Sequence, residues 1–411
     1  MTVQPLTGRA MVKAAILSLG TVWVAYLAFV SAVVNVTHIE NPSLALQFAP
    51  HDPAALDVQA GLMLVKNGGD LVGSDETAAM ARDSLRHQVL NPVALRLLGL
   101  STRRASSFAT GRAVMALAER MTRRDLITEL WLIQEAVLRG DVQSALSHYD
   151  YALRTWEASQ DLLLPILVTA LKDEPVRVAL IPYVREPAPW LLDFTRAAVG
   201  SSKQPSWVAD TYLRAGGMPA DPIYDTMRSG LLGKLAEARE FAWMIRYYES
   251  LPEADSKVLR TVAMTPASTD TRFPPATWGF YSVPGGDSSF VRSSQGNSIE
   301  LHTALEPSVI SPVAFKAMLT PPGLYRFRAD QQIVAPSEGA TGNWEVRCAN
   351  LSGRVLWSGS APLGVQRRRI EGTFAVPDDC QMVMLRAIVA SGDARDGVEA
   401  ILSNASMTPS P

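Results

Sequence analysis

The sequence predicts a multidomain protein with an N-terminal transmembrane helix, an all-α middle region and an all-β C-terminal domain. Three patterns lead to this prediction. An uncharged apolar run lies near the start, apolar residues recur at three- and four-residue steps from about residue 52 to 252, and apolar residues alternate from about residue 299 onward. At 411 residues the chain is too long for a single core, because domains usually hold about 100 to 200 residues.

The composition excludes several classes of protein. With 47% apolar and 19% charged residues the chain is neither disordered nor collagen-like, and its 38 basic and 40 acidic residues argue against a general nucleic-acid binder. Two cysteines exclude a disulfide-dense small fold and a four-cysteine zinc site, but they allow one disulfide.

Residues 14–36 read AAILSLGTVWVAYLAFVSAVVNV and contain no charged side chain. As a helix they cross about 30 Å of hydrocarbon, so we expect them to lie in the lipid bilayer. Arg9 and Lys13 precede this run, whereas acidic residues beginning with Glu40 follow it. The excess of basic residues on the N-terminal side places residues 1–13 in the cytoplasm, and the bulk of the chain in the periplasm of a bacterial inner membrane.

A cleaved signal peptide is the alternative interpretation of the same run. Val30, Ser31 and Ala32 provide small residues of the kind found at a cleavage site. The apolar run nevertheless continues through Val36, beyond the usual length of a signal sequence, which favours an uncleaved anchor. Both interpretations predict export of the remaining chain.

Residues 37–159 are predicted to be helical, and two stretches within them match at a spacing of 34 residues. In each stretch a small side chain is followed four residues later by a large one, and three residues after that by another small one. A large apolar residue lies on the preceding helix. Small side chains let two helices approach and a bulky one fills the gap, so the pattern favours stacked helical hairpins. The predicted packing residues are Leu98, Gly111, Met115 and Ala118 in the first stretch, and Leu132, Ala145, Tyr149 and Ala152 in the second.

This pattern resembles the tetratricopeptide-repeat (TPR) proteins over residues 92–125 and 126–159, with a poorer match at 53–89. Leu98 and Gly99 fit the family's Leu-Gly pair, whereas the second stretch has Leu132 followed by isoleucine. The resemblance implies a helical solenoid with a concave groove for a protein or peptide, and we expect residues 160–252 to extend it. A generic helical bundle remains the alternative.

A Pro- and Thr-rich stretch at 253–275 is expected to be a linker, and a β-sandwich is expected to follow at 276–411. Its strands are predicted from alternation and from turn residues about ten positions apart. The strand count and the segments PPGLYRFRAD and FAVPDDCQMVMLRA resemble the jelly-roll sandwiches used as carbohydrate-binding modules.

The resemblance implies that exposed aromatic side chains stack on sugar rings and that basic side chains contact an acidic polymer. Packing in the core is the alternative for the aromatic residues. Trp344 shares strand parity with Val346, which points inward. The candidate glycan contacts are Trp278, Tyr281, Trp344, Trp357, Arg326, Arg328 and Arg368.

Cys348 and Cys380 both lie in the predicted sandwich, and export to an oxidising compartment allows them to pair. We expect a disulfide between them. Closing a loop of about 33 residues stabilises a fold by roughly 3 to 4 kcal/mol on the chain-entropy model. Two buried free thiols are the alternative.

The sequence shows no signature of catalysis. Its five histidines are scattered singly, with no metal-ligand spacing, and no nucleophile elbow occurs. We therefore expect no metal, no cofactor and no enzymatic activity. An acid pair for glycoside hydrolysis stays open, because Glu300, Glu345 and Glu371 lie in different predicted strands that the fold can bring together.

Chains with this layout resemble anchored repeat proteins that accompany cell-envelope or exopolysaccharide machinery. We therefore expect a periplasmic scaffold that binds other envelope proteins through its helical repeats, with the lipid bilayer as a further partner and no nucleic acid. The alternatives are a glycan-binding protein that uses the sandwich to bind polysaccharide and, less strongly supported, a glycan-active enzyme.

Overall fold

The chain contains two compact units, Met1–Leu163 and Leu164–Pro411, and each is described by itself. The structure is a computed structural model. Residues 1–7 make up most of the predicted cytoplasmic segment and lie outside the residues that the structure describes. The described residues are 8–66, 73–102, 108–293, 298–335, 337–349, 353–392 and 397–410.

The apolar run near the N-terminus forms a helix, as predicted. Helix α1 covers Gly8–Thr37, and its stretch Ala15–Thr37 is 23 residues long with a mean hydropathy of 2.0. Among the described residues it is the one helix with the length and composition to cross a membrane. A signal sequence has the same properties.

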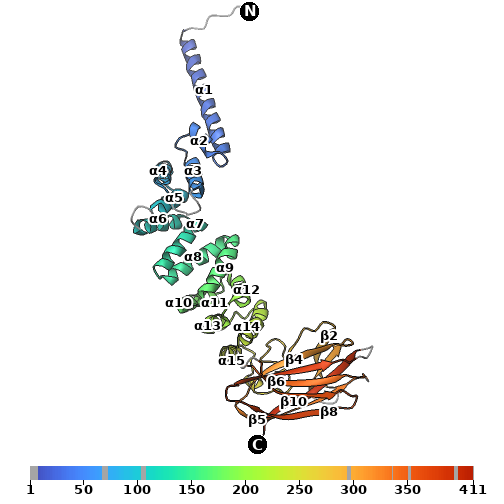
Figure 1. The fold of residues 1–411 in the computed structure, drawn as a ribbon. Helices are drawn as coiled ribbons and strands as arrows, with labels where there is room; N and C mark the ends of the chain where they lie inside the picture. The colour runs from blue at the N-terminus through green and yellow to red at the C-terminus, as the bar shows by residue number, and fades with distance from the viewer. Residues whose placement is uncertain are drawn as a thin grey trace, which may run out of the picture. The chain divides into compact units, whose positions relative to one another are not determined.

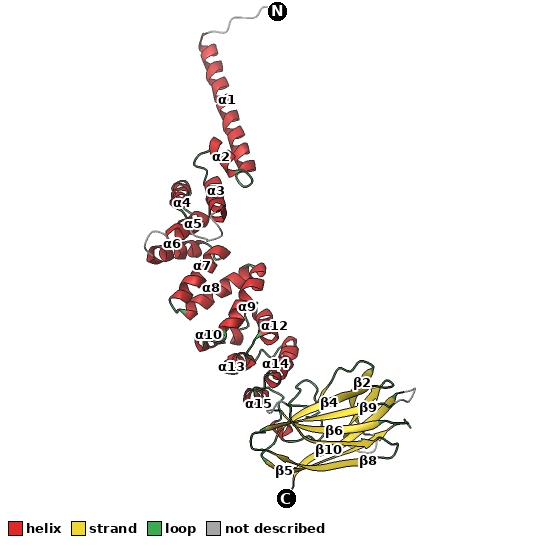
Figure 2. Ribbon diagram, in the orientation of Figure 1, coloured by secondary structure: helices red, strands yellow, loops and turns green. Residues whose placement is uncertain are grey.

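The helices that follow in the first unit pack as consecutive hairpins, α3 on α4, α5 on α6 and α7 on α8 (Figures 1 and 2). Helix α5 begins at Pro92 and α7 at Leu126, 34 residues later, and α6 and α8 are offset in the same way. The bounds are α2 Pro42–Phe48, α3 Pro53–Lys66, α4 Asp75–His87, α5 Pro92–Thr102, α6 Phe108–Met121, α7 Leu126–Leu138 and α8 Val142–Thr155, with α9 at Gln160–Ala170.

The glycines of this region allow close contact between helices. A Cβ on Gly99 would lie 2.9 Å from the side chain of Met115, and one on Gly111 would lie 2.8 Å from Thr102 Oγ1. Leu98 is partly buried and packs against the core of this region. The other predicted packing residues, Gly111, Met115, Ala118, Leu132, Ala145, Tyr149 and Ala152, are buried.

The second unit begins with short helices whose starts and ends follow local sequence signals. Proline occupies the first turn of α10, α11 and α13, and Gly216, with a φ of 96°, ends α13 in the left-handed conformation. Trp190, Phe194 and Tyr212 are fully buried in the helical core. The bounds are α10 Glu174–Ala179, α11 Ile181–Arg185, α12 Leu191–Ser201, α13 Pro205–Ala215, α14 Asp225–Glu237 and α15 Phe241–Glu249, with 3₁₀ turns η2 at Pro222–Tyr224 and η3 at Ser256–Arg260.

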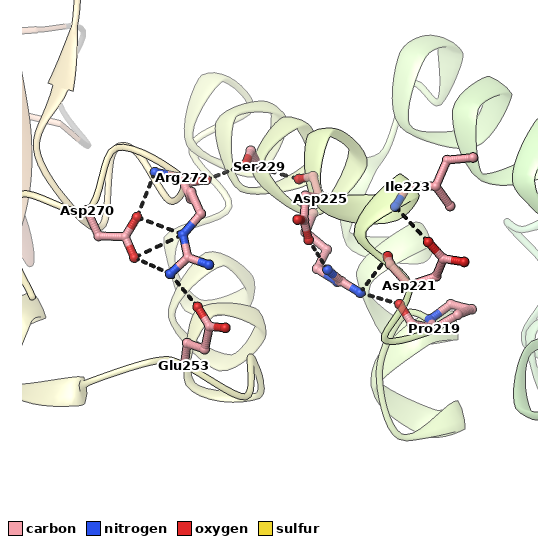
Figure 3. A network of polar contacts seen from close by, with 9 residues as sticks. Pro219, Asp221, Ile223, Asp225, Ser229, Glu253, Asp270 and Arg272 are labelled. Carbon is pink, nitrogen blue, oxygen red and sulfur yellow. Dashed lines mark hydrogen bonds and ion pairs between the residues drawn. The ribbon is translucent and has the colours of Figure 1, made fainter.

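Residues 253–275, which we expected to be a linker, pack against both parts of this unit. Val262 and Met264 belong to the sandwich core. Arg272 binds Asp270 at 2.6 Å and also Glu253, and its carbonyl accepts a hydrogen bond from Ser229 of α14 (Figure 3). The proline and threonine content of this stretch suggested a linker, and it gave no sign that Val262 and Met264 are buried in the sandwich core.

The C-terminal domain is an antiparallel β-sandwich of two five-stranded sheets, ordered β1-β4-β9-β6-β7 and β2-β3-β10-β5-β8 (Figure 1). This confirms the predicted all-β class of the domain. The strands are β1 Gly279–Phe280, β2 Gly286–Arg292, β3 Ile299–Leu305, β4 Ile310–Leu319, β5 Gly323–Ile333, β6 Thr341–Cys348, β7 Val355–Pro362, β8 Arg368–Val376, β9 Met382–Ala390 and β10 Val398–Pro409.

Aromatic side chains fill the space between the two sheets. The rings of Trp278 and Trp344 lie 6.4 Å apart edge to face, and Phe327 lies 5.3 Å from Trp344. Cys348 and Cys380 form the predicted disulfide, with Cα atoms 5.7 Å apart, and both are fully buried. The pairing of these cysteines is thereby confirmed.

Lys316 on β4 is fully buried, and its Nζ donates a hydrogen bond to the carbonyl of Ala276 at 2.5 Å. Burial disfavours the charged ammonium and lowers the pKa of Lys316 to about 7. In the unfolded chain a lysine has a pKa near 10.4. Between these two pKa values the unfolded chain binds more protons than the folded protein, so stability rises with pH over this range.

We predict that Lys316→Met increases the free energy of unfolding at pH 7 and that this gain shrinks toward pH 10. The shift in pKa corresponds to about 5 kcal/mol at most, at about 1.4 kcal/mol for each pKa unit. Thermal unfolding of wild type and variant at pH 7, 8.5 and 10 measures it. If the difference in stability between wild type and variant is the same at all three pH values, Lys316 does not titrate in this range.

Candidate functional site

The candidate site lies on the outer face of the sheet β2-β3-β10-β5-β8. Ser289 pairs with His302, His302 with Ile401, and Ile401 with Gln332, so these four residues lie opposite one another on four neighbouring strands. We call them the outer-face row. Adjacent strands lie about 4.8 Å apart, so the row extends over about 14 Å.

Alternation along each strand directs this row away from the core. Leu301 on β3, and Ala400 and Leu402 on β10, are buried in the sandwich core. Their neighbours His302 and Ile401 must then point to the opposite side of the sheet, where both are half-buried.

The row borders a hollow of about 600 Å³, which we call the outer-face hollow. Glu300 is buried in it, with Oε1 3.1 Å from Arg367 Nη2 and Oε2 3.7 Å from His302 Nε2. A smaller hollow of about 180 Å³ also includes His302, together with Ser289. The outer-face hollow is lined by Val291, Arg292, Ser293, Glu300, His302, Gln332, Arg367 and Ile401.

A second buried carboxylate lies on the same face, beside the hollow. Asp330 accepts hydrogen bonds from Arg369 at 2.9 Å and from Asn404 at 2.9 Å. Burial acts to raise the pKa of Asp330, but these two hydrogen bonds and the charges of Arg369 and Arg367 together outweigh it, so the pKa lies below its usual range. Asp330 is therefore ionised at neutral pH and holds β5, β8 and β10 together.

The outer-face hollow presents hydrogen-bond donors and acceptors side by side. Arg292 and Arg367 donate, the Glu300 carboxylate accepts, and Gln332 does both. Val291 and Ile401 add apolar surface between these groups. A ligand that carries adjacent hydroxyl groups on an otherwise apolar ring matches such a lining.

The three acids that the sequence left open do not come together. Glu300 on β3 and Glu371 on β8 are separated by β10 and β5, which places them about 14 Å apart at the usual strand spacing. Glu345 lies on the other sheet and pairs with Arg347. Carboxyl pairs of glycosidases lie about 5 to 10 Å apart, so these residues do not form one.

Two of the four aromatic glycan candidates are ruled out by their burial. Trp278 and Trp344 are fully buried in the core, because residues before β1 cover one and the facing sheet covers the other. Trp357 is half-buried and packs on Phe327 at 5.3 Å. Tyr281 is half-buried and packs on a phenylalanine of β4. None of the four lines the outer-face hollow.

The three predicted basic contacts do not line the hollow either. Arg326 and Arg328 lie on the same outer face, and Arg328 pairs with Glu371 at 3.1 Å. Arg368 and its neighbour Arg367 point to opposite faces of the sheet, and Arg367 is the arginine that lines the hollow.

The alternation at 299–305 placed Glu300 and His302 on one face of a strand. No signal in the sequence indicated which strands lie beside that strand.

No family model and no curated protein matches this chain. Its C-terminal sandwich is similar in structure to several carbohydrate-binding modules. One is a CBM4 module, with 11% identity, coverage of 36% of this chain and 100% of that chain, and a TM-score of 0.28. Another is the xylan-binding CBM22-1 domain of Paenibacillus barcinonensis Xyn10C, with 10% identity, coverage of 37% of this chain and 96% of that chain, and a TM-score of 0.28. A third is TmCBM61 in complex with beta-1,4-galactotriose, with 11% identity, coverage of 36% of this chain and 99% of that chain, and a TM-score of 0.27.

Proposed function

We propose that this protein is a membrane-anchored glycan-binding protein of the bacterial cell envelope. Helix α1 holds the chain in the inner membrane, with its N-terminus in the cytoplasm, and the sandwich binds a polysaccharide in the periplasm. The observation that carries the proposal is the outer-face hollow, in which Glu300, Arg367 and His302 lie within ion-pair distance beside the outer-face row.

The ion pair of Glu300 and Arg367 in the hollow is suited to the hydroxyl groups of a neutral glycan. Glu300 is buried there, and its carboxylate can accept hydrogen bonds from hydroxyl groups. Arg367 already neutralises Glu300 across a distance of 3.1 Å. A sugar hydroxyl can accept a hydrogen bond from the guanidinium and donate one to the carboxylate without separating the pair.

We predict that Glu300→Gln weakens binding of soluble neutral polysaccharide by the full-length protein about tenfold or more. A hydrogen bond to a charged group contributes roughly 1.5 to 3 kcal/mol, and 1.4 kcal/mol corresponds to a factor of ten in affinity. Affinity electrophoresis of the detergent-solubilised protein through gels that contain xylan or galactan measures the change.

Glu371→Gln is the matched control, because it makes the same change on the same face of the sheet but outside the hollow. We expect it to bind as the wild type does. Equal losses in both variants, or no retardation of the wild type by any neutral polysaccharide, would contradict a glycan site in this hollow.

A second candidate function, a scaffold for envelope or exopolysaccharide assembly proteins, is favoured by an apolar surface on the helices. Val137 and Leu138 at the end of α7 are 61% and 65% exposed, and Leu138 lines a hollow of about 520 Å³ together with Ala109, Arg112 and Glu135. The 34-residue offset between hairpins supports TPR-like repeats, whose surfaces serve as protein-binding grooves.

For this candidate we predict that Leu138→Asp reduces the recovery of partner proteins cross-linked to the full-length chain in intact membranes. A charge in a desolvated apolar contact is costly, so the loss should exceed fivefold. Val89→Asp, which changes another exposed apolar residue outside this hollow, is the control. Recovery of the same cross-linked proteins in equal amounts from the wild type, Leu138→Asp and Val89→Asp would argue against a protein-binding surface at α7.

A further inference from the structure

Three ligand-type side chains meet where helices α6, α7 and α8 come together. Glu119 lies near the end of α6, Glu129 in the first turn of α7 and His148 in the middle of α8. One ligand atom from each of these residues lies within 4.8 Å of the others. They are 10 and 19 positions apart in the chain, so no short motif reveals them.

Glu129 is the unusual member of this cluster. Its side chain is fully buried, and its Oε1 has no hydrogen-bond partner among the described residues. A buried carboxylate oxygen without a partner is unfavourable, because it loses its hydration and gains nothing in return. This oxygen lies in a cluster that offers two further ligand atoms.

The other two residues are positioned by contacts that leave ligand atoms available. His148 Nδ1 lies 2.7 Å from Glu129 Oε2, and its side chain is 17% exposed. Glu119 Oε1 accepts a hydrogen bond from Arg123 Nε at 3.1 Å, and its side chain is 14% exposed. Arg123 is thus the hydrogen-bond partner of Glu119, and His148 is that of Glu129.

We propose that Glu119, Glu129 and His148 bind a divalent transition-metal ion. The ion takes the place of the proton between His148 and Glu129 and supplies the partner that the buried carboxylate lacks. An imidazole with two carboxylates is a ligand set suited to Zn²⁺, which takes nitrogen and oxygen ligands, and not to Mg²⁺, which prefers oxygen alone. Bound there, the ion joins the hairpin of α5 and α6 to that of α7 and α8.

A second cluster, His51, Asp83 and His87, also has three ligand atoms within 4.8 Å. It differs in burial, since the side chains of His51 and His87 are 63% and 45% exposed. Both histidines already have hydrogen-bond partners on Asp83 and are open to solvent, so nothing in their surroundings requires an ion. This cluster therefore provides a control for nonspecific binding of metal by histidine.

Isothermal titration of the chelator-treated, full-length protein in detergent with ZnCl₂ tests the proposal. We expect one site, and a loss in affinity of at least about tenfold in Glu129→Gln, since even residues outside the ligand shell commonly contribute 10- to 100-fold. The amide replaces a buried charge with a group of the same shape, so the variant is expected to fold. His87→Gln should bind Zn²⁺ as the wild type does.

Thermal unfolding provides a second readout that does not depend on heat of binding. Zn²⁺ should raise the unfolding temperature of the wild type and of His87→Gln, because a ligand that binds only the folded state stabilises it, and should raise that of His148→Gln much less. MgCl₂ should have no effect. Equal Zn²⁺ affinity in wild type and Glu129→Gln, or a Zn²⁺ effect lost only in His87→Gln, would overturn the proposal.

Discussion

The two-residue alternation of β-strands is the constraint on which the candidate site depends. In the sheet β2-β3-β10-β5-β8 it directs Leu301, Ala400 and Leu402 into the core, and the same rule sends His302 and Ile401 outward. Because antiparallel pairing fixes the register between neighbours, outward residues from distant parts of the sequence form one row. The core and the candidate binding face are therefore two results of a single pattern, and a shift of one strand by one residue would destroy both.

The hydrogen-bond partners of three buried carboxylates distinguish their roles. Asp330 is buried with hydrogen bonds from Arg369 and Asn404 that hold it ionised, which is a structural role. Glu300 is buried with partners that a ligand can share. Glu129 is buried with one oxygen that has no partner in the described part of the chain. These differences, and not burial alone, separate a residue that stabilises the fold from residues suited to bind a hydroxyl or an ion.

Much of the architecture was predictable from local patterns, and the sites were not. The uncharged run predicted α1, the 34-residue spacing predicted where α7 follows α5, and alternation at Ile299 to Leu305 predicted β3. The pairing of β3 with β10, which begins at Val398, joins residues nearly a hundred positions apart, and no local pattern encodes it. Trp278 could be interpreted as an exposed platform because Val262, whose carbonyl accepts a hydrogen bond from its indole Nε1 at 3.2 Å, lies in a stretch that resembles a linker.

The measurement that tests the account most directly is hydrogen–deuterium exchange of the full-length protein with and without a neutral polysaccharide that it binds. Amides of β3, β10 and β5 around His302, Ile401 and Gln332 should be protected by the glycan, because a chain across the outer-face hollow shields those strands from solvent. Protection confined to helices α5 to α8, or to the sheet that contains β6 and β9, would contradict it.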